Sequence, residues 1–327
     1  MKLFKIEEND SSQRLDKFLK KLLTNSSLSL VYKLNRKNKI KVNSKRVDNE
    51  YKLQIGDEIK LFLNDDEYET LTKPAMVSEG SSNKSGSAIN RGDIIYEDGH
   101  LLIINKNPGI IVHPGDFKTK DISLIEQVQD YLGNSLNSLT FKPSLIHRID
   151  KDTSGIIMIA KTKKALDFML KELQNDRIDK HYLAICVGNL NGEGNISKKL
   201  RRIEDARNEN KIVIDDINGQ KAVTNYKVLK NDINGKYSLL ECVLETGRMH
   251  QIRVHLASIG CPILGDNAYG SKGENSFAKL HLGIGRQLLH SYKVSFMHPE
   301  KKVKVTYYAK LKEDMRSLLG DINLKEI

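Results

Sequence analysis

The chain of 327 residues is long enough for one large domain and a smaller one. Hydrophobic residues make up 39% of it, enough for a core, and 53 Lys and Arg against 42 Asp and Glu give a formal net charge of +11. This charge predicts a polyanionic partner, either nucleic acid or a membrane surface. Since no apolar run approaches the roughly 18 residues of a spanning helix, we do not expect an integral membrane protein.

The cysteines and the first residues predict the compartment. Cys186, Cys242 and Cys261 are an odd number without paired spacing, which argues against a disulfide framework and for a reducing environment. Cys186 and Cys242 lie within apolar runs and are expected in the core. The start, MKLFKIEEND, lacks the apolar stretch of a signal peptide. We therefore expect a cytoplasmic protein.

Residues 1–63 have the pattern of a compact unit of their own. Residues 14–23 place apolar side chains three and four apart, which predicts an amphipathic helix. Ser29 is expected to cap a second helix. Alternating residues predict short strands at 39–43 and 56–63.

Positive charge is concentrated in this N-terminal unit, which has 15 Lys and Arg against 8 Asp and Glu. A solvated charged face is the ordinary alternative, but the density and single sign favour contacts with phosphates. We predict that RNA is bound by basic residues of the second helix and the turn after it, namely Arg36, Lys37, Lys39, Lys41 and Arg46.

A change of composition separates this unit from the rest of the chain. Residues 64–92 lack an apolar period and have a Gly/Ser-rich centre, so we predict a flexible linker. A large domain should then span residues 93–327. Apolar runs and their periods predict strands at 94–98, 101–105, 155–160, 180–187, 239–244 and 301–308, an irregular hairpin within 188–220, and helices at 122–132, 163–175, 251–259 and 311–319.

Residues 145–161, LIHRIDKDTSGIIMIAK, hold a charged cluster in the turn before a buried strand. Such a turn gives a reacting carboxylate the rigid support that it needs. The alternative is that Asp150 or Asp152 merely ends a strand and caps the turn.

A second basic cluster, ETGRMHQIRVH, occupies residues 245–255. His250 and His255 are five residues apart, which does not suit a zinc pair, so we predict no metal site. Arg253 could form an ordinary pair with a phosphate or a carboxylate. Tyr182, at the mouth of an apolar strand, could pack in the core or stack on a ligand.

The motif HRID at 147–150, with TSG at 153–155, resembles the catalytic motif of the RluA-type pseudouridine synthases. Their large-subunit rRNA members of the RluC type, followed by the RluD type, are the most similar. The resemblance implies that Asp150 is the catalytic residue and that Arg253 forms the ion pair that positions it. It also implies that Tyr182 stacks on the target base.

Residues 1–63 in turn resemble the alpha-L RNA-binding motif shared with protein four of the small ribosomal subunit. The Arg-His-Pro signature of the RluD type is not found between 188 and 220, which favours the RluC type. Together the resemblances imply an α+β fold. The catalytic domain should have a mixed, largely antiparallel sheet with flanking helices, and the N-terminal RNA-binding domain should be a small α/β unit.

The implied reaction isomerises uridine to pseudouridine and needs no cofactor. The ionised carboxylate could attack C1′ or remove a proton, and both routes stay open. The base must leave the RNA stack before it reaches the site. Arg148 would fill the gap or hold a phosphate, Leu289 would form an apolar wall of the pocket, and His147 is expected to contact the RNA.

We therefore expect site-specific pseudouridine formation in large-subunit (23S) ribosomal RNA by a monomer with no membrane partner. Action on tRNA or on the RluD-type rRNA site is the alternative within the family. A non-catalytic ribosome-assembly protein and a carboxylate-dependent hydrolase are the other classes. Asp150 and Asp152 would face opposite sides of an extended strand, which fits poorly with the paired carboxylates of a hydrolase.

Overall fold

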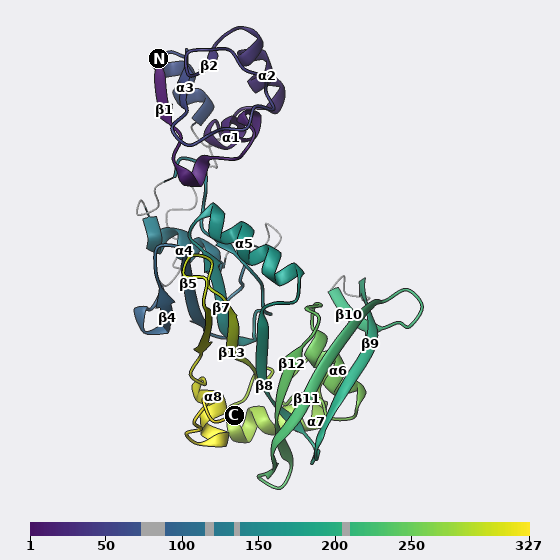
Figure 1. The fold of residues 1–327 in the computed structure, drawn as a ribbon. Helices are drawn as coiled ribbons and strands as arrows, with labels where there is room; N and C mark the ends of the chain where they lie inside the picture. Colours follow the sequence, from purple (N-terminus) through teal and green to yellow (C-terminus); the bar gives the residue numbers. More distant parts are fainter. Residues whose placement is uncertain (73–88, 115–120, 134–137, 205–209) are drawn as a thin grey trace.

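The computed structural model describes residues 1–72, 89–114, 121–133, 138–204 and 210–327. Figure 1 shows a small N-terminal unit and a much larger domain that holds most of the helices and strands. The α+β class expected from the sequence is confirmed. Most of the predicted linker, residues 73–88, lies outside the described residues.

The N-terminal unit packs two amphipathic helices on a three-stranded antiparallel sheet of order β1-β3-β2. Leu15, Phe18 and Leu19 of the first helix are buried against Val31 of the second, as the apolar period predicted. The elements are β1 (Lys2–Lys5), α1 (Leu15–Leu22), α2 (Leu28–Arg36), β2 (Ile40–Val42) and β3 (Glu58–Leu61).

The N-cap of α2 is Ser27, whose hydroxyl accepts the backbone N–H of Leu30 at 3.2 Å. The expectation that Ser29 caps this helix is therefore wrong. Ser29 lies within the first turn, and its hydroxyl bonds to that of Ser27.

Helix α3 (Asp65–Thr72) corrects the start of the predicted flexible linker. Asn64 and Glu67 cap each other's backbone N–H groups, and acidic residues in the first turn suit the positive end of the helix. Tyr68 and Leu71 pack against the core of the N-terminal unit. The acidic composition hid this helix because few of its residues are apolar.

A short 3-10 helix of the N-terminal unit, η1 (Glu8–Asp10), is hydrogen-bonded to residues 138–140 of the large domain. The carboxylate of Asp10 is fully buried. It accepts the hydroxyl of Ser138 at 2.9 Å, the backbone N–H groups of Leu139 at 2.7 Å and Thr140 at 2.9 Å, and the hydroxyl of Thr140 at 2.6 Å. The sequence did not predict that the two units are hydrogen-bonded to each other.

The large domain is built on one mixed sheet of eleven strands in the order β10-β9-β11-β12-β8-β13-β7-β5-β4, with β14 beside β13 and β6 beside β7. Only the β13–β7 pairing is parallel among the described strands. The strands are β4 (Ile94–Glu97), β5 (Leu101–Lys106), β6 (Ser144–Leu145), β7 (Ser154–Ala160), β8 (Asp179–Val187), β9 (Glu193–Glu204), β10 (Asn210–Ile214), β11 (Gln220–Ile233), β12 (Tyr237–Leu244), β13 (Leu289–Met297) and β14 (Lys304–Tyr308).

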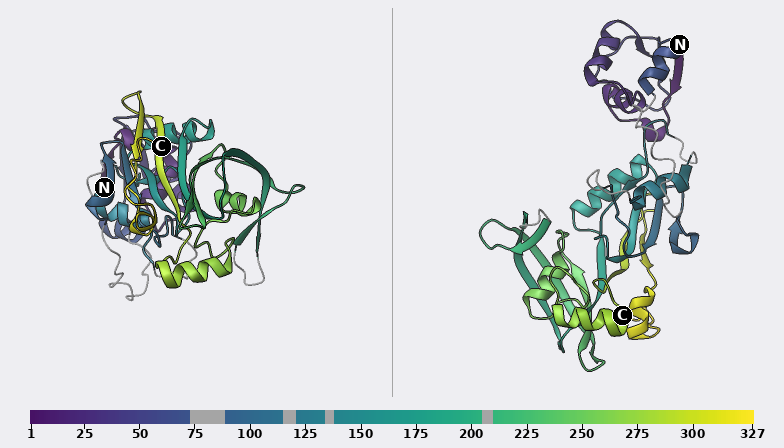
Figure 2. Two further views of the ribbon diagram at one scale, coloured as in Figure 1. Left: turned by 90° about the horizontal axis from the view of Figure 1, so that it is seen from below. Right: turned by 180° about the vertical axis from the view of Figure 1, so that it is seen from behind.

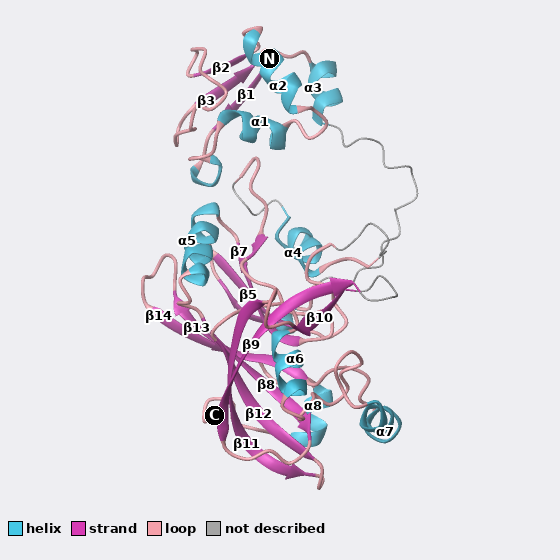
Figure 3. Cartoon of the chain, turned by 90° about the vertical axis from the view of Figure 1, so that its right-hand side faces the viewer, coloured by secondary structure: helices cyan, strands magenta, loops and turns pink. Residues whose placement is uncertain are grey.

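Helices cover the sheet at both ends, as Figure 3 shows. Figure 2 shows β9 to β12 curling around α6, which contacts β9, β10 and β11. The helices are α4 (Leu124–Leu132), α5 (Lys163–Gln174), α6 (Gln251–Ser258), α7 (Lys272–Leu282) and α8 (Glu313–Leu319). Among the described residues, no helix combines the length and apolar character that crossing a membrane would require.

Strand β7, which lies between β13 and β5 in the sheet, is buried along its whole length. Gly155 has φ +107°, and a Cβ there would lie 2.2 Å from the carbonyl oxygen of Ser291. Glycine is required because β13 passes so close to the backbone. Cys186 in β8 and Cys242 in β12 are free and fully buried, as expected.

Candidate active site

A cleft of about 540 Å³ opens where the turn before β7 meets the start of α6. It brings together residues as far apart in the chain as Ile111 and Leu289. Six of the predicted site residues line it: His147, Arg148, Asp150, Tyr182, Arg253 and Leu289.

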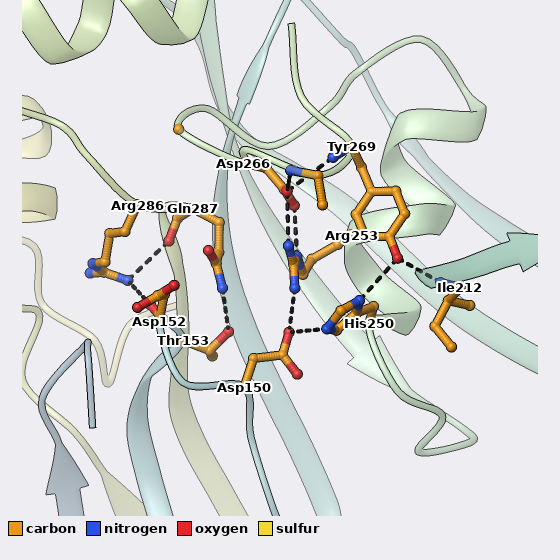
Figure 4. A network of polar contacts seen from close by, with 12 residues as sticks. Asp150, Asp152, Thr153, Ile212, His250, Arg253, Asp266, Tyr269, Arg286 and Gln287 are labelled. Atoms are coloured by element: carbon orange, nitrogen blue, oxygen red, sulfur yellow. Dashed lines mark hydrogen bonds and ion pairs between the residues drawn. The ribbon is translucent and has the colours of Figure 1, made fainter. Parts of the chain in front are cut away.

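Asp150 lies in the turn that leads into β7, where its carbonyl oxygen accepts the N–H of Thr153. Its side chain is 24% exposed. Oδ2 of Asp150 accepts a hydrogen bond from Nη1 of Arg253 at 2.9 Å. Within the described part of the chain, neither a hydrogen bond nor an ion pair ends on Oδ1, as Figure 4 shows. Oδ1 is therefore the oxygen open to a substrate.

Arg253 is also bound by Asp266, a residue that belongs to none of the motifs identified in the sequence. Two parallel bonds of 2.7 and 2.9 Å join the guanidinium to the fully buried carboxylate (Figure 4). Burial alone would raise the pKa of Asp266, but the hydrogen bonds and charge of Arg253 outweigh it and hold the pKa below its ordinary value. The two carboxylates in turn raise the pKa of Arg253, against the opposing effect of its burial.

His250 also faces the carboxylate, with Nε2 3.7 Å from Oδ2 of Asp150. Its Nδ1 lies 2.9 Å from the hydroxyl of Tyr269. In the sequence, His250 stood out only as a candidate metal ligand whose spacing to His255 does not suit zinc. No group of His, Cys, Asp and Glu within the described ranges has an arrangement that could hold a metal ion.

Tyr182 and Leu289 form a buried wall of the cleft, 5% and 4% exposed. They belong to the neighbouring strands β8 and β13, where Leu289 pairs with Ala184. Burial raises the pKa of Tyr182 to about 12, so its hydroxyl stays protonated at neutral pH. The ring offers an apolar, uncharged face.

His147 and Arg148 occupy opposite environments although they are adjacent. Nε2 of His147 accepts the backbone N–H of Met158 at 3.2 Å, and burial lowers its pKa to about 3, so the ring is neutral. Arg148 is exposed at the rim of the cleft. The RNA-binding roles predicted for both residues stay predictions.

Buried cations fix the backbone just after Asp150. Nζ of Lys106, which is 1% exposed, donates to the carbonyl oxygen of Lys151 at 2.7 Å, and burial lowers its pKa to about 7. Nη1 of Arg286 donates to the carbonyl oxygen of Asp152 at 3.0 Å (Figure 4). Among the described residues that line the cleft, Asp152 is absent. The two carboxylates of this turn therefore do not form the acid–base pair of a hydrolase.

The basic residues predicted to bind RNA in the N-terminal unit do not line the cleft. They lie at the end of α2, along β2 and in the turn after it, with Arg36, Lys37 and Arg46 exposed and Lys39 and Lys41 half-buried. Their role in RNA binding stays a prediction.

Residues 100–258 match the family described as RNA pseudouridylate synthase, and residues 13–59 match the S4 domain. The chain is 31% identical to the ribosomal large subunit pseudouridine synthase C of Buchnera aphidicola subsp. Baizongia pistaciae, over 97% of this chain and 96% of the relative. Identity to the synthase of the same name from Vibrio cholerae is 33%, over 96% and 94% of the two chains.

A solved structure has the same fold in the large domain. Human RNA pseudouridylate synthase domain containing 4 superposes with a TM-score of 0.55 at 24% identity, over 70% of this chain and 93% of the human chain.

Proposed function

The chain belongs to the RNA pseudouridylate synthase family, and we propose that its substrate is large-subunit ribosomal RNA, in which Asp150 isomerises specific uridines to pseudouridine. It is an RNA pseudouridine synthase, an isomerase, with an S4 domain at its N-terminus. The similarity to relatives named ribosomal large subunit pseudouridine synthase C over nearly their whole length supports this choice of RNA.

The observation that carries the catalytic proposal is the placement of Asp150. One oxygen is fixed by Arg253 at 2.9 Å and the other opens into the cleft. A carboxylate fixed in this way is held in one orientation, as either attack on C1′ or removal of a proton requires. Rejoining the base through C5 balances the reaction without an oxidant, a reductant or a second substrate.

The cleft walls support extrusion of the base from the RNA. The face of Tyr182 and the side chain of Leu289 would hold the uracil ring by stacking and apolar contact. Arg148 at the rim would take the place left in the stack or hold a phosphate. The N-terminal unit would add salt-sensitive affinity through its basic residues.

We also propose that the protein acts as a monomer in the cytoplasm, where its three free thiols stay reduced.

The test is pseudouridine mapping after incubation of the purified protein with transcripts of large-subunit rRNA, small-subunit rRNA and tRNA. We expect new sites in the large-subunit transcript only. Asp150→Asn should abolish them while RNA affinity stays within about threefold, because a carboxylate makes no attractive contact with the phosphates that supply most of the affinity. Asp152→Asn is the matched control and should retain activity.

Each other outcome contradicts one part of the proposal. Sites in tRNA alone would refute the choice of RNA. Full activity of Asp150→Asn would refute the catalytic role of Asp150, and tight binding without pseudouridine in any transcript would favour a ribosome-assembly role.

A further inference from the structure

His250 and Tyr269 form a second support for the reactive carboxylate, next to Arg253 (Figure 4). We infer that His250 is a positioning residue whose Nε2–H group is aimed at Oδ2 of Asp150 by the hydroxyl of Tyr269. The inference deepens the proposed function and rests on Asp150 being the reacting group.

The proton positions follow from the available donors and acceptors. The backbone N–H of Ile212 in β10 donates to the hydroxyl oxygen of Tyr269 at 2.9 Å. The phenolic proton then needs an acceptor, and Nδ1 of His250 lies 2.9 Å away. Nδ1 is therefore the unprotonated nitrogen of the neutral ring, and the ring proton is on Nε2.

The charge of Asp150 favours the same tautomer. The opposite tautomer would turn the lone pair of Nε2 towards a carboxylate oxygen 3.7 Å away, which is repulsive. The charged groups that face the ring are Asp150, Arg253 and Asp266. Burial has the largest effect on His250 and lowers its pKa, so the ring is neutral at neutral pH.

The backbone is arranged for this orientation. His250 has φ 52°, a left-handed conformation that residues with a Cβ rarely adopt, at the N-cap of α6. The rings of Tyr269 and His250 pack in an edge-to-face arrangement, with ring centroids 5.6 Å apart at 75°. The guanidinium of Arg253 lies over the Tyr269 ring, with its Cζ 5.2 Å from the centroid of that ring. Both groups that face Oδ2 thus share one aromatic support.

In this arrangement the two oxygens of Asp150 have different roles. Oδ2 faces Arg253 and His250, while Oδ1 faces the cleft. At 3.7 Å the His250 contact is longer than a hydrogen bond, and we propose that it closes in the RNA complex, as catalytic contacts commonly do. Holding Oδ2 from two sides would restrict rotation of the carboxylate and direct Oδ1 at the ribose.

The kinetic test compares His250→Leu, His250→Gln and Tyr269→Phe with the wild type. His250→Leu should lower kcat about 10- to 100-fold, as loss of an orienting partner does. The KM for RNA should change less than about twofold, because the side chain is only 17% exposed and carries no charge to pair with a phosphate. His250→Gln places an N–H near the position of Nε2 and should restore most of kcat.

A double-mutant cycle tests the order of the contacts. If the hydroxyl of Tyr269 acts through His250, Tyr269→Phe should lower kcat in the wild type and have no further effect in His250→Leu. Equal losses in the leucine and glutamine variants, or additive effects of the two positions, would overturn the inference. Thermal unfolding of each variant identifies any that fail to fold.

A measurement without activity separates this inference from the proposed function. Long-range ¹H–¹⁵N NMR of the histidine-labelled protein reports the tautomer of each ring, and His250→Gln assigns the signal. Protonated Nε2 and bare Nδ1 are expected for His250. The opposite tautomer would overturn the inference even in an active enzyme, whereas a wild type that forms no pseudouridine would refute the proposed function instead.

Discussion

Replacing Asp266 by Asn tests whether the buried ion pair behind Arg253 orders the site. Arg253 is 7% exposed and makes two of its three charge-assisted bonds to Asp266. Breaking a buried pair by removing one partner costs about 3–5 kcal/mol. Because Arg253 keeps Asp150 as a partner at 2.9 Å, we expect the lower end of that range, about 3 kcal/mol.

The same change should lower activity without weakening RNA binding. With an uncharged Asn at position 266, the guanidinium of Arg253 loses the ion pair that fixes its orientation towards Oδ2 of Asp150. We expect kcat to fall about 10- to 100-fold. Asp266 is fully buried and does not line the cleft within the described residues, so RNA affinity should stay at the wild-type value.

Urea unfolding and single-turnover pseudouridine formation measure the two effects. Asp179→Asn is the matched control, because it breaks an exposed pair with Lys304 whose side chains are 47% and 65% exposed. That pair is worth at most about 1 kcal/mol. If Asp266→Asn unfolds like the control and keeps full kcat, the reasoning that Asp266 holds Arg253 in place is refuted.

Three further predictions concern other parts of the molecule. Asp10→Ala removes the acceptor of four hydrogen bonds between the two units, at a cost of about 1–3 kcal/mol; the radius of gyration in X-ray scattering should rise, and an unchanged curve would show that other contacts hold them together. Hydrogen bonds from His181 and Tyr292 lower the pKa of Glu241 to about 2. The ionised Glu241 carboxylate therefore stabilises the fold fully above about pH 4.5, and this stabilisation is lost as the pH falls towards 2. In urea unfolding, Glu241→Gln should lower the free energy of unfolding by about 3 kcal/mol at pH 7 and by less in acid. A loss that does not depend on pH would contradict this. Burial lowers the pKa of Lys106 from 10.5 to about 7. Between about pH 7 and pH 10.5 the Lys106 amine is therefore protonated in the unfolded chain but not in the folded protein, so the free energy of unfolding should rise with pH. Between pH 7 and 9.5 the wild type should gain about 3 kcal/mol relative to Lys106→Met, and parallel unfolding curves would argue against a buried, destabilised ammonium group.

Much of the fold could be predicted where one element buries one continuous face. The apolar run at 155–160 is the fully buried β7, and the period at 163–175 is α5. Helix α7 was missed because Ala278 is its only buried residue, so no apolar period marks it. A helix that is stabilised by its capping residues and buries few side chains shows little apolar periodicity, so it is hard to predict from the sequence.

The site could be predicted only where a resemblance supplied the pairing. Asp150 and Arg253 are 103 residues apart, and the order of the sheet strands rather than local spacing brings them together. His250 was visible as a polar residue in a basic cluster, but its partner Tyr269 meets a backbone N–H of another strand. Such a contact between separate segments produces no periodic pattern in the sequence. Asp266 lies beside Gly265 in a short turn, and that local pattern suits an ordinary turn equally well.

The most direct test of the central claim is a pseudouridine map of large-subunit rRNA from cells that lack this protein, complemented with the wild type or with Asp150→Asn. We predict that specific sites disappear in the deletion and return only with the wild type. A map that is unchanged by the deletion, or sites that return with Asp150→Asn, would contradict the account.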